Sequence, residues 1–169
     1  MMQTDSYTMC KPRSNIILGT MLVLVQLLVG VNLYAAPPVN CKRDLNIRAV
    51  TNLDFGTLMV SAAGVVVVDT NGARYSNGGV ITAGGTVSAA EFAVGGCKDY
   101  AYDIVVQPTA TISSGSNTMM IDNFIILPTT GLTSPKGKQS LFLGGTLHVN
   151  DAQPQGLYSG SFLLEVIGQ

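Results

Sequence analysis

The sequence contains one histidine, His148, and a hydrolytic triad built on it would need a nucleophilic serine nearby. Serines are plentiful, but no Gly-x-Ser-x-Gly elbow occurs, and no helix is predicted to follow one. His148 alternates with the apolar residues Leu147 and Val149, which places its side chain on the opposite, outer face of a strand. We therefore interpret His148 as an exposed structural residue.

Glycoside hydrolysis would need two carboxylates about 5 to 10 Å apart across a cleft. Candidates among the ten acidic residues are Asp69, Glu91, Asp99, Asp103 and Asp122. None has a sequence context that singles it out, and turn-type hydrogen bonds explain those beside Gly and Asn. We expect no catalytic residue and do not predict an enzyme.

The sequence also lacks clear ligand-binding motifs. The nearest approach to a calcium loop, residues 69–72, has neither the remaining ligands nor a closing glutamate. The glycine-rich pieces lack the spacing of phosphate-binding loops. We therefore expect no cofactor. Because neither the basic nor the acidic residues form a long run in the sequence, we also expect no nucleic-acid partner.

The cysteines point to a disulfide. Cys10 lies in a segment that we expect to be removed, which leaves Cys41 and Cys97 as an even pair in an oxidising compartment. A disulfide between them would stabilise the fold by about 4 kcal/mol through loop closure. Two free or intermolecular thiols are the alternative. A metal site is not expected, because two sulfurs without CxxC spacing and the distant His148 do not make a tetrahedral ligand set.

The N-terminal part has the layout of a signal peptide. Residues 16–31 form an apolar run that follows Lys11 and Arg13 and precedes small residues. We expect residues 1–35 to be cleaved off and residues 36–169 to form one domain. The alternative is an uncleaved membrane anchor, because about 20 apolar residues span a bilayer. The protein is predicted to be exported to the periplasm, the cell surface or the medium, and to contact a membrane only through this segment if it stays uncleaved.

The rest of the chain is predicted to form β-strands, with almost no helix. Residues 100–106 and 141–149 alternate apolar and polar side chains, as strands with one buried face do. The β-branched run 65–68 leads into Asn71-Gly72, which predicts a hairpin over residues 64–76 with a two-residue turn. Frequent turn signals divide the chain into about eight or nine strands, which is typical of an all-β antiparallel sandwich or barrel.

The last strand has the clearest pattern. Its apolar face is predicted to carry Tyr158, Gly160, Phe162, Leu164 and Val166. Polar residues alternate with them, so the chain is expected to end inside a sheet. Removing its last six residues is therefore expected to destroy solubility, unlike the removal of most termini.

Several short segments in sequence order carry a resemblance to a known type of protein. They are Leu53-Asp54-Phe55-Gly56-Thr57-Leu58, Val68-Asp69-Thr70-Asn71-Gly72, Ala89-Ala90-Glu91-Phe92, Gly144-Gly145-Thr146-Leu147 and Tyr158-Ser159-Gly160-Ser161-Phe162. In these segments the chain resembles exported bacterial β-sandwich domains of unknown function, similar in style to pilin and spore-coat-like subunits. The resemblance implies an immunoglobulin-like sandwich.

Subunits of chaperone and usher pili end in an alternating strand with a glycine fourteen positions from the end and an aromatic residue next to last. Gly156 holds the first position, whereas Gly168 replaces the aromatic residue. Such subunits also donate an N-terminal extension to a neighbour's sheet, but residues 36–40 are too few to form a donor strand. An interior fibre subunit is therefore expected only if Leu45, Ile47 and Ala49 form the donated row.

Three functions follow in order of preference. The first is an exported structural or adhesive protein, a cell-surface or pilus-like subunit whose partners are itself, related subunits or a periplasmic chaperone. The second is a self-contained secreted or periplasmic binding module that uses loops at residues 110–118 and 128–138. The third is an undetected hydrolase, which a cleft pairing His148 with an aspartate would favour.

Overall fold

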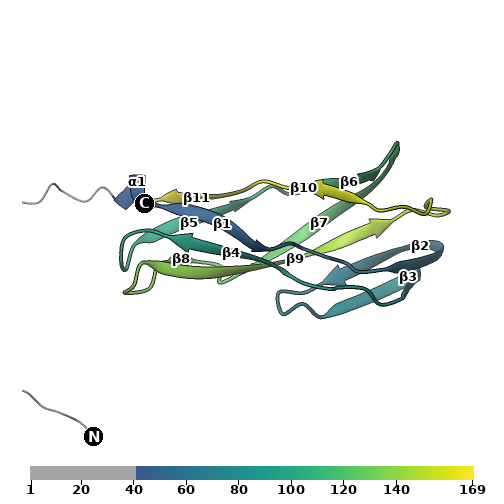
Figure 1. Cartoon of the computed structure of the whole chain (residues 1–169), viewed down its shortest axis with the longest axis horizontal. Helices are drawn as coiled ribbons and strands as arrows, with labels where there is room; N and C mark the ends of the chain where they lie inside the picture. The colour runs from purple at the N-terminus through teal and green to yellow at the C-terminus, as the bar shows by residue number, and fades with distance from the viewer. Residues whose placement is uncertain (1–40) are drawn as a thin grey trace, which may run out of the picture. The chain divides into compact units, whose positions relative to one another are not determined.

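The computed structural model describes residues 41–169, which form a β-sandwich (Figure 1). The elements are α1 (Cys41–Asp44), β1 (Asn46–Thr51), β2 (Leu58–Val68), β3 (Arg74–Thr82), β4 (Ala90–Gly95), β5 (Ala101–Val106), β6 (Ala110–Ser114), β7 (Asn117–Leu127), β8 (Gly131–Leu132), β9 (Lys138–Val149), β10 (Ser159–Ser161) and β11 (Leu164–Gly168). The predicted all-β antiparallel sandwich is confirmed. The strand count rises to eleven because β8 is very short and the last strand divides in two.

The strands form two antiparallel sheets of unequal size. The larger sheet has the order β1-β4-β9-β7-β6-β10, with β2 also paired to β9 and β3 paired to β2. The smaller sheet has the order β11-β5-β8. One edge of β9 serves two partners, because Lys138 to Leu143 pair with β4 and Gly145 to Val149 pair with β2.

The change of partner along β9 falls at Gly144. A Cβ atom there would collide with the carbonyl oxygen of Val68, so only glycine allows β2 to approach at this point. On the opposite edge, β7 has an irregularity in its pairing with β9 between Asp122 and Ile125. The Gly144-Gly145 pair is thus where β9 changes neighbours.

Two apolar clusters fill the sandwich. The first, which we call the covered core, contains Val94, Tyr102 and Leu141, with Ile104 and Val166 of the smaller sheet packed on them. The second, which we call the groove core, has as buried members Phe55, Val66, Val68, Val80, Ala110, Met119, Ile121, Leu147 and Val149. Both cores draw residues from β9, and the predicted alternation of residues 141–149 is confirmed by their burial.

The disulfide between Cys41 and Cys97 is present and joins α1 to the segment after β4. Immediately after α1, Leu45 and Ile47 pack against the covered core. Ile47 lies in this domain's own first strand and Leu45 directly before it, so they do not form a donated row.

The β2–β3 hairpin differs from its predicted form. The prediction of a two-residue turn at Asn71-Gly72 was wrong. The backbone N–H of Asp69 donates a hydrogen bond to the Ala73 carbonyl (3.0 Å), so the loop has three residues, Thr70 to Gly72. The Asp69 carboxylate accepts hydrogen bonds from the backbone N–H groups of Asn71 (2.9 Å) and Ala73 (2.8 Å). Within the loop of residues 70–72 only Gly72 has a positive φ, of 80°, which is typical of a type I turn followed by a glycine bulge.

Residues 110–118, predicted as a binding loop, are mostly strand. They comprise β6, a turn at Gly115-Ser116 and the start of β7. Residues 128–138 contain β8 and a turn in which the backbone N–H of Gly137 donates to the Ser134 carbonyl (2.8 Å).

No helix within residues 41–169 has the length and apolar character to cross a membrane.

The Tyr102 hydroxyl is held inside the covered core. It donates to Gln139 Oε1, which also accepts the backbone N–H of Leu132 (2.9 Å). Burial raises the pKa of Tyr102 from 10.0 to about 12, because the charged phenolate is poorly solvated there. The hydroxyl therefore stays protonated in the folded protein at a pH where the unfolded chain has lost the proton.

This difference predicts an alkaline loss of stability. Since the folded pKa lies above the unfolded value, stability from Tyr102 is complete below pH 10 and falls as the pH rises towards 12. Urea unfolding at pH 8 and pH 11 should show a larger drop for the natural protein than for Tyr102→Phe. Tyr75→Phe, at an exposed position, is the matched control and should behave like the natural protein. Equal drops in all three proteins would contradict the prediction.

Candidate functional site

An apolar groove of about 1120 Å³ opens over the groove core. One wall is residues 51–60, the link from β1 into β2, and the other wall is residues 153–162, which include β10. Figure 1 shows these two segments with β7 and β9 running between them. The floor of the groove carries Ala110, Ile112, Met119, Ile121, Leu147 and Val149.

The groove exists because the smaller sheet covers only part of the larger one. Beyond Val106 the chain leaves the smaller sheet and enters β6 of the larger sheet. The terminal strand makes the reverse change at Phe162-Leu163. Hydrogen bonds fix the two crossings together: Gln107 N–H donates to the Leu163 carbonyl (3.0 Å), and Leu163 N–H donates to Gln107 Oε1 (3.3 Å). Past this point, no second sheet formed by residues 41–169 faces the floor residues.

Both walls include strand edges without a ladder partner among the described residues. β10 pairs only with β6, and residues 58–60 of β2 pair only with β3. A strand paired on one side leaves backbone N–H and C=O groups free on the other. The groove therefore offers backbone hydrogen-bonding groups beside an apolar floor.

Aromatic side chains set the limits of the groove. Phe162 stacks on Phe124 with ring centroids 5.2 Å apart and meets Phe92 edge-on at 6.1 Å. The Tyr158 hydroxyl donates to the Pro154 carbonyl (2.7 Å) and accepts from Gln153 Nε2 (2.8 Å). These contacts hold the 153–162 wall in place.

The predicted apolar row of the terminal strand is divided between two places. Tyr158, Gly160 and Phe162 line the groove. Leu164 and Val166 lie in β11, half-buried, and Val166 packs on the covered core. At the chain end, the Tyr100 hydroxyl donates to the Gln169 carbonyl (2.6 Å), and its ring lies where a side chain at Gly168 would project. The residue directly before β5 thus supplies the aromatic group that position 168 lacks.

The groove is almost free of charge. Asp54 is the only ionisable acid or base in its lining other than Tyr158. The Asp54 carboxylate accepts the N–H of Gly56 (2.8 Å) and so stabilises its own turn. This lining suits an uncharged, apolar occupant.

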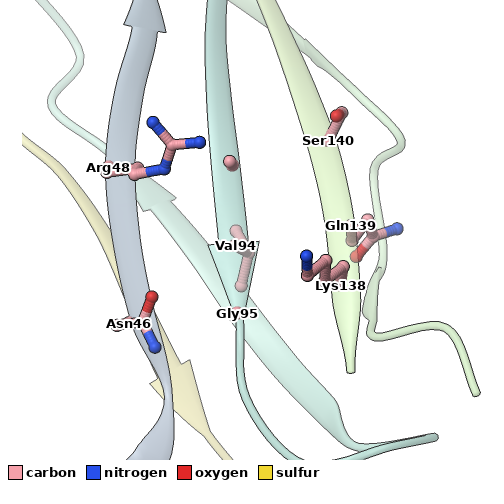
Figure 2. A pocket seen from close by; sticks show the side chains of 8 residues that line it. Asn46, Arg48, Val94, Gly95, Lys138, Gln139 and Ser140 are labelled. Atoms are coloured by element: carbon pink, nitrogen blue, oxygen red, sulfur yellow. The ribbon is translucent and has the colours of Figure 1, made fainter. Parts of the chain in front are cut away.

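A second, shallower hollow of about 390 Å³ lies on the outer face of the larger sheet (Figure 2). Arg48 and Asn46 of β1 face Lys138 and Ser140 of β9 across the intervening strand β4. We call this feature the outer hollow.

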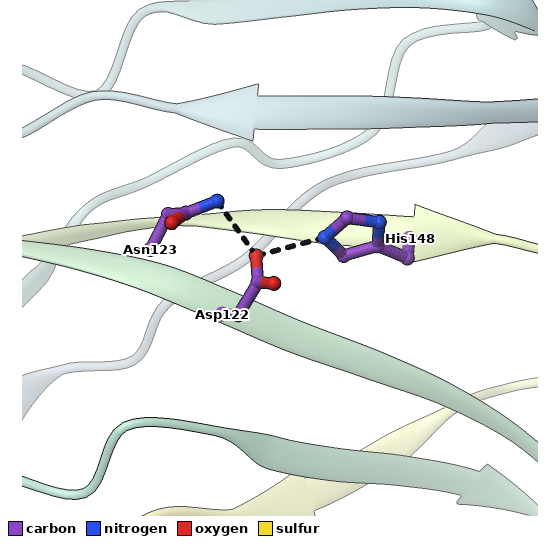
Figure 3. A network of polar contacts seen from close by, with 3 residues as sticks. All are labelled: Asp122, Asn123 and His148. Atoms are coloured by element: carbon purple, nitrogen blue, oxygen red, sulfur yellow. Dashed lines mark hydrogen bonds and ion pairs between the residues drawn. The ribbon is translucent and has the colours of Figure 1, made fainter.

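His148 lies on the outer face, as expected, and binds Asp122 of β7 (Figure 3). His148 Nε2 is 2.8 Å from Asp122 Oδ1, and Asn123 Nδ2 donates to the same oxygen (3.0 Å). The His148 side chain is 38% exposed. Neither His148 nor Asp122 lines the groove or the outer hollow, and within residues 41–169 His148 has no hydrogen bond to a hydroxyl or thiol.

The other carboxylates considered for hydrolysis have separate surroundings. Asp69 stabilises the β2–β3 turn, Asp99 has a turn conformation with φ of 51°, and Asp103 accepts from Gln169 Nε2 (2.9 Å). Across the described part of the chain, no three His, Cys, Asp or Glu residues gather as a metal site would need.

Residues 45–167 match the family model of DUF4402, a domain of unknown function. The chain belongs to the DUF4402 family. The match includes nearly all eleven strands and both walls of the groove. No curated protein and no solved structure matches the chain.

Proposed function

We propose that this DUF4402 protein is an exported, non-enzymatic structural or adhesive protein, a subunit of the cell surface or of a pilus-like appendage. It associates by taking an extended segment of another chain into the groove. The observation that supports this proposal is the apolar floor between two walls whose strand edges have no ladder partner in the part of the chain that the structure describes. Strand addition uses these features: backbone pairing gives affinity and alternate side chains fill the pocket.

The energetics favour an occupied groove. An added strand places every second side chain on the floor, and each large apolar side chain fully buried there contributes about 1.5 to 3 kcal/mol. The same strand also satisfies backbone groups on the walls. Without it, the unpaired edges and apolar floor promote aggregation.

The occupant is expected to be an extended, uncharged segment with apolar residues at alternate positions. It comes from a related subunit or a periplasmic chaperone, because residues 36–40 of a second copy are too few to form a donor strand. Leu45 and Ile47 pack in their own domain, so β1 does not serve as the donated strand. In this proposal the domain acts as an acceptor.

The first test is light scattering on residues 36–169, expressed in an oxidising periplasm. We expect aggregation that a co-expressed chaperone or an added peptide of alternating Val and Thr relieves. The same peptide with its central residue replaced by proline is the control, because proline cannot continue the ladder. A stable monomer that does not bind the peptide would instead favour the self-contained binding module.

A matched pair of variants locates the peptide in the groove. Leu157 lines the groove and is 89% exposed, so Leu157→Asp should leave the fold intact but weaken peptide binding at least tenfold. Ile125→Asp, at an exposed position outside the groove lining, should bind like the natural protein. Fluorescence anisotropy of a labelled peptide measures both. Equal affinities would place the peptide elsewhere.

Export through residues 1–35 is part of the proposal. These residues lie outside the described part of the structure. Intact mass of the protein recovered from the envelope or medium is expected to correspond to residues 36–169 with two hydrogens removed for the disulfide. A full-length protein retained in the cytoplasm would contradict the proposed export.

A further inference from the structure

The outer hollow results from the register of three neighbouring strands. The residues form two rows that cross β1, β4 and β9. Arg48, Ala93 and Ser140 make up one row. Asn46, Gly95 and Lys138 make up the other. At these two positions the middle strand thus contributes only a methyl group and a hydrogen atom. The outer two strands are about 10 Å apart, twice the spacing of neighbouring strands. Long side chains can therefore converge over β4 (Figure 2).

The charge of the outer hollow is positive. Arg48 and Lys138 line it, and no carboxylate does. Among the side chains that the structure describes, His148 and Asp122 form the one ion pair, so neither Arg48 nor Lys138 is paired with a carboxylate there. Arg74 is different, because its guanidinium donates to the carbonyls of Phe55 (2.7 Å) and Gly84 (3.2 Å) and so serves the fold.

We propose that the outer hollow binds an oxyanion of the phosphate class. The planar guanidinium of Arg48 can donate two parallel hydrogen bonds to such a group, and Lys138 adds a point charge from the facing strand. The Ser140 hydroxyl supplies a further donor. The site is separate from the groove, which lies on the inner face of the sheet, so it does not depend on the proposed strand addition.

Glu91 is the nearest carboxylate on this face of β4, two residues from Ala93, and it does not line the hollow. Its negative charge opposes binding of an anion. Glu91→Gln is therefore expected to tighten phosphate binding by a few fold, in the opposite direction to the loss of either cation.

The test is an NMR titration of the exported protein with inorganic phosphate at low ionic strength. Amide shifts are expected at Ala93 and Gly95, and Arg48→Ala/Lys138→Ala should weaken binding at least tenfold. Lys98→Ala/Lys136→Ala removes the same charge outside the hollow and should change affinity less than twofold. Equal losses in the two double variants, or shifts spread over the surface, would overturn the proposal.

Two further arms identify the source of the phosphate. Co-sedimentation with phosphatidylglycerol vesicles but not phosphatidylcholine vesicles, lost in Arg48→Ala/Lys138→Ala, would assign the hollow to a lipid headgroup. Phosphate binding without vesicle binding would assign it to a soluble phosphate. Absence of both would overturn the proposal, whatever the outcome of the groove experiments.

Discussion

A protein that lacks residues 164–169 is expected to be insoluble. The deletion removes all of β11, which pairs with β5 from Leu164 opposite Val106 to Gly168 opposite Tyr102. It also removes Val166 from the covered core and leaves β5 paired only with the two-residue strand β8. The free energy lost with the strand pairing and the core packing is expected to exceed the free energy of unfolding of a typical domain, which is roughly 5 to 15 kcal/mol.

The soluble fraction after periplasmic expression and the circular dichroism of any soluble protein measure the effect of the deletion. Ile167→Ser is the matched control, because Ile167 belongs to the same strand but is half exposed. This variant should stay soluble with the β-type spectrum. A folded, soluble protein without residues 164–169 would contradict the role given to β11.

Loss of the disulfide is expected to lower the free energy of unfolding by about 4 kcal/mol. The bond joins positions 56 residues apart, and a long loop left open adds conformational entropy to the unfolded chain. Cys41→Ser/Cys97→Ser should therefore unfold at a much lower urea concentration than the oxidised protein.

Reducing agent provides the internal control for this prediction. It should lower the unfolding midpoint of the natural protein towards that of the double variant and leave the variant unchanged. An unchanged midpoint in the natural protein after complete reduction, checked by mass, would show that loop closure contributes little here.

The sequence was most informative where one face of a strand is buried. Residues 141–149 keep apolar residues at odd positions, and this period of two remains even where β9 exchanges β4 for β2. The same regularity concealed the break in the terminal strand. Phe162 and Leu164 are both half-buried although they flank the crossing between sheets, so alternation could not indicate which sheet each residue joins.

The candidate site was predicted only in part. Tyr158, Gly160 and Phe162 were identified from their alternation, but the 51–60 wall was not, because its position opposite β10 depends on long-range pairing. The outer hollow likewise requires the register of three strands. A local signal for it exists in the sequence: Ala93 and Gly95 are small residues that alternate with the large residues Phe92 and Val94.

The double partnership of β9 has a consequence for cooperativity. Leu141 lies in the covered core, while Leu147 and Val149 lie in the groove core, so one strand belongs to both. Local unfolding around either core would break hydrogen bonds of β9 that the other core also needs. The backbone amides around both cores are therefore expected to exchange hydrogen with solvent in one cooperative step. A ligand held in the groove should therefore slow amide exchange around Val94 and Tyr102, which it does not touch.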